Sequence, residues 1–412
     1  MKFSKLSQLF LVSSIGLVVA TLLNGCLLVS IDYVYLACSA GSGSSTGQIQ
    51  IFAADAASGA LRPGASSISS GGNSPVSLTV SGNFANLYAA NQGTSNNVVH
   101  FAIDNNGNLT QKDVVTGLGT PVSIVVNQAG TYLYGVFSNG TGANSATLAA
   151  LPLAADGTIG SASAAVAVPL TVPGHPNDTV IPTQVVVLAN NNAVYISAYD
   201  QSVYNPGGKI TSGDTANPGW VFGFSVGTGG TLTPTAASPY QAGVKPVALA
   251  ADPTNRFVYV TDFAASQLIG YSIQSGSNLN FFLAPPTATG KQPSAIVFDP
   301  RGKFIYITNE LDSSVSAFAI DLSTGAPTAA INVSNGFTNP TDTDPVAIVV
   351  DPSLGRFVYT ANYLGNSISG FRLDPTSGSL GQTQATPYPS GAQPTAITAI
   401  PHGNHNVQSV TP

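Results

Sequence analysis

The sequence predicts an all-β fold, a seven-bladed β-propeller whose blades are four-stranded antiparallel sheets, and three observations support this prediction. Only 7% of the 412 residues are charged, and the chain contains 43 glycines and 28 prolines, a composition typical of many short strands joined by tight turns. One sequence unit recurs along the chain at intervals of 46 to 64 residues. The two ends of the chain carry complementary fragments of that unit.

The repeat unit contains four expected strands. Its clearest copies begin at Pro246, Pro293 and Pro345, and each has an apolar strand, a polar turn and a second apolar strand with a tyrosine. An alternating third strand such as 315–320, a turn and a short fourth strand complete the unit. The turn between the third and fourth strands recurs as in 321–325, where Asp caps the turn and Gly supplies a positive φ. Four strands per repeat are typical of a propeller blade.

The ring is expected to close through one blade shared by both chain ends. The last repeat begins at Pro394 and is cut short after one strand, whereas residues 33–36 and 48–52 match the second and third strands of a blade. Joining these fragments makes a seventh blade and removes two exposed sheet edges. We therefore expect a single propeller domain over residues 26–402 and a tail over 403–412.

The N-terminus has the pattern of an export signal. Lys2 and Lys5 precede the apolar run 9–23, and the sequence Leu-Asn-Gly-Cys ends at Cys26. This pattern resembles a bacterial lipobox, which implies a signal peptide over residues 1–25 and lipidation of Cys26. The alternatives are a plain secretory signal and a single membrane anchor. Each implies export, and the lipobox implies a cell-envelope lipoprotein that is lipid-anchored and faces the outer membrane or the periplasm. If Cys26 were not lipidated, a disulfide with Cys38 would be conceivable.

The repeat also indicates a family. The segment 293–309, with the pattern Pro-x-x-Ile-x-x-Asp-Pro-x-Gly-x-Phe-x-Tyr-x-Thr-Asn, resembles the YVTN-type repeats of the seven-bladed lactonase family, which includes 6-phosphogluconolactonase-like proteins. The resemblance implies a propeller fold and hydrolysis or closure of sugar and muconate lactones without a metal. No catalytic motif of that family can be assigned to particular residues of this chain.

Several functional classes are disfavoured. The net charge of −6, with no basic run past the first residues, argues against a nucleic-acid partner. The four histidines do not have metal-ligand spacing, and the chain has no haem-attachment motif, phosphate-binding loop or Gly-x-Ser-x-Gly elbow. We therefore expect no metal and no cofactor.

Two long loops concentrate polar residues. In a four-stranded blade, the loops from strand two to three and from strand four to the next blade emerge on one face, around the channel mouth. The extra residues of 169–181 and 199–218 lie in such loops, so we expect the two loops to be neighbours. Together they offer His175, Asp178, Asp200, Tyr204, Lys209 and Asp214, with Trp220 just after the second loop. The alternative is that these are ordinary surface loops packed on each other.

A second set of candidates surrounds the same mouth. The position three residues past each strand-two tyrosine is polar in four repeats, at Asn91, Asp262, Asn309 and Asn362. Such a ring could hold a polyol or a sugar, or each side chain could cap its own loop. Lys245 and Lys291 stand just before repeat prolines and could supply cations for an anionic lactone; surface lysines are the alternative.

Glu310 is the only glutamate in the chain. It lies beside Asp312 at the start of an expected loop, where it is a candidate general base for attack of water on a lactone carbonyl. Other charged residues are expected to be structural: Arg256, Arg301 and Arg356 recur beside the turn between strands one and two. The segment 339–344 is a weak calcium candidate, with a plain loop tip favoured.

Two functions remain open. The scarcity of acids, bases and nucleophiles favours a non-catalytic envelope propeller, a monomer that binds a small polar ligand, a glycan or an envelope protein at its loop-rich face. The alternative is a metal-independent lactone hydrolase. The two can be distinguished by geometry. A bare ring of asparagines would favour binding, and Glu310 or His175 meeting Lys245 or Lys291 would favour hydrolysis.

Overall fold

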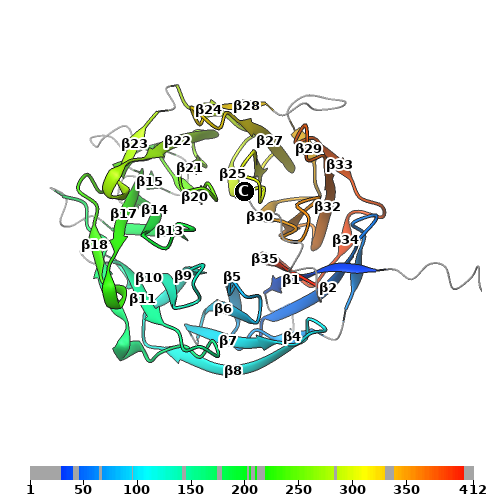
Figure 1. Ribbon diagram of the computed structural model, residues 1–412, viewed down its shortest axis with the longest axis horizontal. Helices are drawn as coiled ribbons and strands as arrows, with labels where there is room; N and C mark the ends of the chain where they lie inside the picture. Colours follow the sequence, from blue (N-terminus) through cyan, green and yellow to red (C-terminus); the bar gives the residue numbers. More distant parts are fainter. Residues whose placement is uncertain are drawn as a thin grey trace, which may run out of the picture.

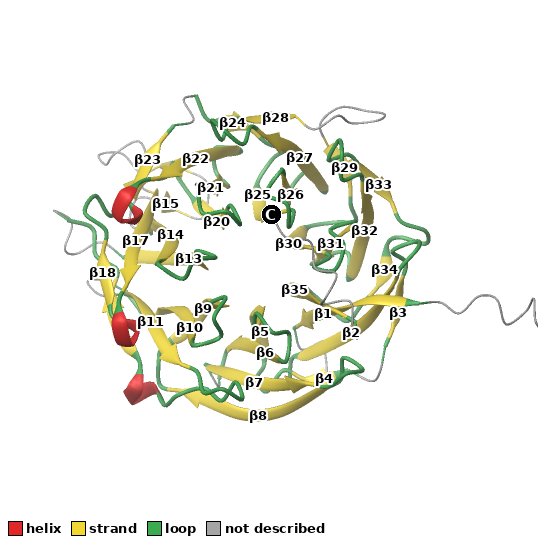
Figure 2. Ribbon diagram, viewed as in Figure 1, coloured by secondary structure: helices red, strands yellow, loops and turns green. Residues whose placement is uncertain are grey.

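The computed structural model describes residues 29–39, 46–64, 67–94, 96–141, 145–173, 179–201, 204–205, 209–210, 219–282, 285–329 and 338–402. Within these ranges, seven antiparallel sheets of four or five strands stand around a central axis (Figure 1). The predicted all-β, seven-bladed propeller is therefore confirmed. Three one-turn 3-10 helices lie at the outer edge of the ring (Figure 2): η1 (Ala162–Ala164), η2 (Thr228–Gly230) and η3 (Ser275–Ser277).

We number the blades 1 to 7 from the innermost strand that begins near Pro75. The innermost strands line the channel and are, in blade order, β5 (Ser74–Val80), β9 (Thr120–Val126), β13 (Val180–Val187), β20 (Pro246–Ala251), β25 (Pro293–Phe298), β30 (Pro345–Val350) and β35 (Pro394–Pro401). The second strands are β6 (Asn86–Gln92), β10 (Tyr132–Ser138), β14 (Ala193–Asp200), β21 (Phe257–Asp262), β26 (Phe304–Asn309), β31 (Phe357–Asn362) and β1 (Ser30–Cys38).

The outer half of each blade follows the same order. The third strands are β7 (Asn97–Ile103), β11 (Ala146–Pro152), β17 (Gly219–Val226), β22 (Gln267–Ile273), β27 (Ser314–Ile320), β32 (Ser367–Leu373) and β2 (Gln48–Asp55). The fourth strands are β8 (Leu109–Thr116), β12 (Val166–Pro169), β18 (Leu232–Pro234), β23 (Leu279–Phe281), β28 (Pro327–Ala329), β33 (Leu380–Gln382) and β3 (Leu61–Pro63). Further short strands pair with third strands: β4 (Ile68–Ser69), β19 (Tyr240–Gln241), β24 (Thr287–Ala288), β29 (Thr338–Pro340) and β34 (Tyr388–Pro389). A separate hairpin joins β15 (Tyr204–Asn205) to β16 (Lys209–Ile210).

Blade 7 combines the two ends of the chain. β1 lies between β35 and β2, so that Tyr35 is paired with Thr398 on one side and with Ile51 on the other. The predicted ring closure is thus confirmed. Among the described residues, no helix is long and apolar enough to span a membrane.

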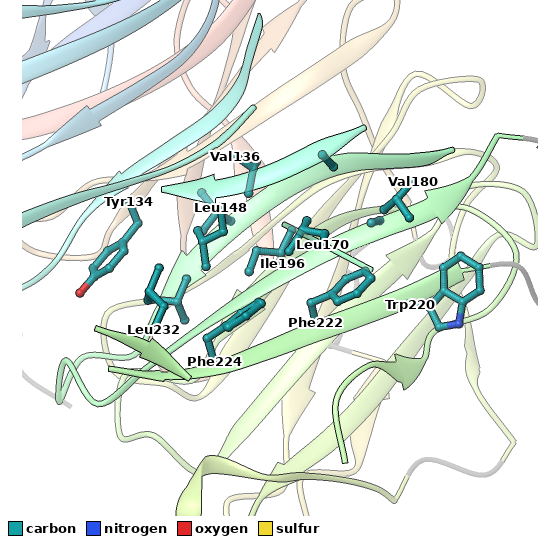
Figure 3. Packing of buried hydrophobic residues seen from close by; sticks show 14 of the residues in the cluster. Tyr134, Val136, Leu148, Leu170, Val180, Ile196, Trp220, Phe222, Phe224 and Leu232 are labelled. Atoms are coloured by element: carbon teal, nitrogen blue, oxygen red, sulfur yellow. The ribbon is translucent and has the colours of Figure 1, made fainter. Parts of the chain in front are cut away.

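The core lies between neighbouring blades. The second strands are almost completely buried because a sheet covers each of their faces, which explains their continuous apolar sequences. Between blades 2 and 3, Leu148 packs in one cluster with Ile196 and Phe222 (Figure 3). Trp220 belongs to this cluster and is only 6% exposed.

One hydrogen bond repeats between blades. The hydroxyl group of a strand-two tyrosine donates to a backbone carbonyl in the turn between strands three and four of another blade. Tyr35 donates to Gly107 at 2.8 Å, and Tyr306 donates to Gly378 at 3.0 Å. The corresponding pairs with glycine acceptors elsewhere are Tyr88 with Gly157, Tyr259 with Gly325 and Tyr359 with Gly59. The repeated tyrosines and turn glycines therefore hold neighbouring blades together.

Two of the recurring arginines, Arg256 and Arg301, also join neighbouring blades, at the same end of the strands as these turns. Arg301 donates to the carbonyl of Leu354 at 2.7 Å and to that of Gly355 at 3.0 Å, in the first turn of the next blade. Arg256 pairs with Asp252 at 2.8 Å and reaches the Leu322 carbonyl. These contacts support the structural interpretation of the recurring arginines.

Candidate functional site

The channel has two ends. At one end, each second strand finishes beside the start of an innermost strand, as the pairing of Asn309 with Pro293 and of Asn362 with Pro345 shows. We call this end the loop mouth. At the other end, the innermost strands turn into the second strands, and we call it the turn mouth.

Three ionisable residues meet at the loop mouth. Glu310 follows β26 in blade 5, and its backbone N–H donates to the Gln292 carbonyl at 2.9 Å. Lys245 precedes β20 in blade 4, and Asp344 precedes β30 in blade 6. The Lys245 and Asp344 carbonyls accept backbone N–H groups from Phe263 and Tyr363, respectively. The polypeptide backbone thus fixes all three residues around one sector of the mouth.

Glu310 and Asp344 form a carboxyl pair. Burial raises the pKa of Glu310, and the negative charge of Asp344 together with a hydrogen bond between the two side chains raises it further, while the charge of Lys245 opposes the shift. Burial also raises the pKa of Asp344, and the hydrogen bond from Glu310 acts in the opposite direction. Two close carboxyl groups favour a state in which they share one proton.

Lys245 is the cation of this cluster. Its Nζ atom lies 4.4 Å from the centre of the Phe263 ring and 5.8 Å from that of the Tyr199 ring. Burial lowers the pKa of Lys245, and the charge of Glu310 counteracts this effect. Aromatic faces attract a cation, so these rings hold the ammonium group beside the carboxyl pair.

The polar residues at the ends of the second strands fit the alternative in which each side chain caps its own loop. Asn91, Asp262, Asn309 and Asn362 lie at those ends, but all four are completely buried. Asn362 donates to Ser367 and Ser369 of its own blade, both at 3.0 Å. Asp262 accepts the backbone N–H groups of Val244 and Lys245 at 2.8 and 3.0 Å. These side chains hold their own loops, and Asp262 in addition positions Lys245.

The remaining candidates differ in whether the structure describes them. Asp200 is buried at the end of β14, and the Lys291 side chain is exposed while its backbone N–H donates to Asp312 at 2.8 Å. His175, Asp178, Asp214 and Cys26 lie outside the described residues, as do the side chains of Tyr204 and Lys209. The expected proximity of the two long loops depends on these residues and stays a prediction. Trp220 belongs to the core, not to a loop surface.

Cys38 is not in an environment that would make its thiol reactive. The thiol is buried in blade 7, and burial raises its pKa to about 12. A buried thiol with a raised pKa is a poor nucleophile at neutral pH.

Asp344 is the residue that sequence reasoning missed. It closes the segment 339–344, which we considered as a calcium loop, yet the Asp342 carboxylate accepts the Ser367 hydroxyl and the Thr343 N–H, both at 2.8 Å. The signal for Asp344 was its position: it directly precedes the repeat proline Pro345, as Lys245 precedes Pro246. That position begins the innermost strand at the loop mouth.

Comparison with known proteins agrees with the fold. The model of the seven-bladed β-propeller lactonase family matches residues 34–180 and 171–405. A search of curated proteins finds no match. The structure is similar to the periplasmic gluconolactonase of Pseudomonas aeruginosa, with 21% identity, a TM-score of 0.69 and coverage of 90% of this chain and 99% of the other. It is also similar to a candidate 6-phosphogluconolactonase from Bacteroides fragilis, with 17% identity, a TM-score of 0.70 and coverage of 91% and 99%.

Proposed function

Because this chain belongs to the seven-bladed β-propeller lactonase family, we propose that it hydrolyses a lactone at the loop mouth, with Glu310 and Asp344 as an acid and base pair. The observation that supports the proposal is the meeting of Glu310, Asp344 and Lys245 from three consecutive blades. The sequence criterion for hydrolysis was Glu310 or His175 meeting Lys245 or Lys291, and the electrostatic interaction of Glu310 with Lys245 supports it. The asparagines that would have favoured binding alone are buried, and their side chains form hydrogen bonds within the protein.

The reaction requires one proton on the carboxyl pair. Asp344 accepts a proton from water while the water oxygen forms a bond to the lactone carbonyl carbon. The bond between that carbon and the ring oxygen then breaks, and Glu310 donates its proton to the departing oxygen. The product is the open-chain hydroxy acid, and transfer of the proton from Asp344 to Glu310 restores the pair. The net change is the addition of one water molecule.

Lys245 stabilises the charge that develops during this reaction. Attack of water places negative charge on the carbonyl oxygen, and a cation fixed in a partly buried site stabilises that charge more strongly than it would in water. Lys245 is partly buried and held by aromatic rings. It also suits the carboxylate or phosphate of an anionic lactone.

A sugar lactone is the substrate class we favour. The rings of Phe263 and Tyr199 lie against Lys245, and aromatic side chains near the loop mouth suit the apolar side of a sugar ring. The similar Pseudomonas aeruginosa protein is named as a gluconolactonase, which supports the same class.

We further place the protein in the cell envelope, lipid-anchored through Cys26. The lipobox-like sequence supports this proposal. β1 begins at Ser30 near the turn mouth and ends at Cys38 near the loop mouth. Only three residues, 27–29, separate Cys26 from β1. An anchor at Cys26 would therefore leave the loop mouth directed away from the membrane. Metabolic labelling with a palmitate analogue, which Cys26→Ala should abolish, tests the anchor.

The test of the activity is hydrolysis of a lactone panel by the purified protein. We would follow proton release from glucono-δ-lactone, galactono-γ-lactone and dihydrocoumarin, corrected for spontaneous opening. Turnover of a sugar lactone above the uncatalysed rate supports the proposal. Binding of these lactones without turnover on any of them would instead make the loop mouth a binding site, and the chain a non-catalytic envelope propeller.

A further inference from the structure

We propose that the turn mouth holds a second site, separate from the Glu310 cluster, that binds an uncharged carbohydrate with Phe84 as its stacking surface. A cavity of about 1000 Å³ occupies this end of the channel. It is lined by the later residues of the innermost strands and by the turns that follow them, including Phe84, Gln184 and Val297. Its volume is at the upper end of the range for small-molecule sites.

Phe84 is an unusual residue for its position in the turn between the first and second strands of blade 1. It has a φ of 57°, in the left-handed region. The residues with positive φ in the corresponding turns of blades 2 to 6 are Gly130, Asn191, Asn255, Gly302 and Gly355. Glycine and asparagine adopt this conformation readily, whereas a bulky aromatic residue is strained in it. Residues held in strained backbone conformations cluster at functional sites.

The structure of the blades does not require an aromatic ring in this turn, since five blades form the turn without one. Phe84 packs with one side against the buried cluster that contains Leu87 and Ile400, yet it stays partly exposed and lines the cavity. The ring thus presents a face to the channel at the cost of an unfavourable backbone conformation.

The wall of the cavity is polar on one side. Blades 1 and 2 contribute Ser77, Thr79 and Ser123, whose hydroxyl oxygens accept the N–H groups of Ile124, Val126 and Val185 at 3.2 to 3.3 Å. The side-chain amide oxygen of Gln184 accepts the Leu249 N–H at 2.7 Å. The two N–H groups of the same side-chain amide point away from Leu249. Each hydroxyl group can still donate its own hydrogen. This side of the cavity therefore offers donors to an oxygen-rich ligand.

The opposite wall is apolar. Blades 4 to 6 contribute Ala250, Val297, Phe298, Pro300, Val350 and Pro352. The one ionisable side chain among the lining residues is Asp299, which is fully buried and accepts the N–H groups of Lys303 and Phe304 at 2.7 and 2.8 Å. A wall of hydroxyl and amide groups facing an apolar wall, with no accessible charge, suits a neutral sugar, which has hydroxyl edges and apolar faces.

The test is isothermal titration calorimetry with maltotriose, cellotriose and chitotriose, comparing the native protein with Phe84→Asn and Phe84→Trp. Asparagine already occupies this turn position in blades 3 and 4, so the first variant should fold and keep its melting temperature within a few degrees. We expect one of the sugars to bind, at least a tenfold loss of affinity in Phe84→Asn, and retained affinity in Phe84→Trp. Val114→Asn, which removes an exposed apolar side chain of the same blade, should change nothing.

Other outcomes would overturn the proposal. No binding of any of the three sugars excludes the site as a carbohydrate site, and full affinity in Phe84→Asn excludes Phe84 as its stacking surface. If binding is lost in Glu310→Gln but kept in Phe84→Asn, the sugar occupies the loop mouth instead. Lactone turnover in Phe84→Asn should remain unchanged, which separates failure of this site from failure of the proposed activity.

Discussion

The hydroxyl group of Tyr359 donates a 2.8 Å hydrogen bond to the backbone carbonyl of Gly59, 300 positions away in the sequence. This bond joins blade 6 to blade 7, the blade that the two ends of the chain build together. It belongs to the same series as the bonds of Tyr35, Tyr88 and Tyr306 with other turn carbonyls. Ring closure thus uses the same tyrosine-to-turn hydrogen bond that joins other neighbouring blades.

Replacement of Tyr359 by phenylalanine should lower the free energy of unfolding by about 1–2 kcal/mol, because the buried Gly59 carbonyl loses its partner. Tyr134→Phe is the matched control: the Tyr134 hydroxyl is buried and has no hydrogen-bond partner among the described residues, so its removal should be neutral or slightly stabilising. Guanidinium denaturation measures both. Equal losses in the two variants would contradict a role for the bond.

Gly378→Ala should destabilise the fold by about 2–4 kcal/mol, since it adds backbone strain and overpacks the core. Gly378 has a φ of 73°, and a Cβ atom there would lie 2.3 Å from Cδ1 of Phe304. Gly381→Ala, three residues along the same hairpin, would meet no atom within 4 Å and should leave the stability unchanged or slightly higher. Similar melting temperatures for the two variants would refute this account of the turn glycine.

Asp32 should make the stability fall with rising pH. It is fully buried, and burial, together with the charge of Asp351, raises the pKa of Asp32 to about 9. Its carboxyl group is then protonated in the folded state but ionised in the unfolded state between about pH 4 and pH 9, so stability is lost as the pH rises through this window. Asp32→Asn should stabilise the protein by at least about 1 kcal/mol at pH 8 and flatten the curve between about pH 4 and pH 9.

The matched control for Asp32 is Asp104, an exposed turn residue whose pKa is lowered by hydrogen bonds from Asn108 and Asn106. Asp104→Asn should leave the slope of the stability curve between about pH 4 and pH 9 unchanged. If Asp32→Asn were less stable than the native protein at pH 8, the buried carboxyl group would have to be ionised there.

Lactone hydrolysis should have a bell-shaped pH profile, because the proposed mechanism needs one proton on the Glu310 and Asp344 pair. The alkaline limb reports loss of that proton and should lie above pH 4.5, the ordinary pKa of a glutamate, since burial and Asp344 raise the pKa of Glu310. The charge of Lys245 lowers that pKa, so Lys245→Met should move the alkaline limb to higher pH. Lys291→Met should not move it, and an unshifted limb in Lys245→Met would count against the cluster.

The architecture could be predicted because it depends on local patterns. The repeat prolines, the strand-two tyrosines and the Asp to Gly turns each mark a fixed place in a blade, and the strand pairing of β1 with β35 follows from which fragments the chain ends carry. These features reflect strand periodicity and turn chemistry, which a single sequence displays.

The site was only half predictable. Glu310 and Lys245 were placed at the correct end of the channel, but Asp344, 34 residues after Glu310, becomes its partner only through the curvature of the ring. The buried asparagines were at the predicted ends of their strands, yet whether an Asn side chain turns toward the channel or toward Ser367 is decided by packing. The αL conformation of Phe84 has no sequence signal, because phenylalanine occupies the position that glycine or asparagine takes in the corresponding turns of blades 2 to 6.

The most direct test of the proposed activity is the rate of sugar-lactone hydrolysis by Glu310→Gln beside Asp312→Asn, which removes a neighbouring exposed carboxylate of the same loop. We predict that Glu310→Gln lowers kcat by about 100-fold to 10,000-fold while Asp312→Asn stays within a few-fold of the native rate. Native turnover in Glu310→Gln would contradict the assignment of the acid and base pair.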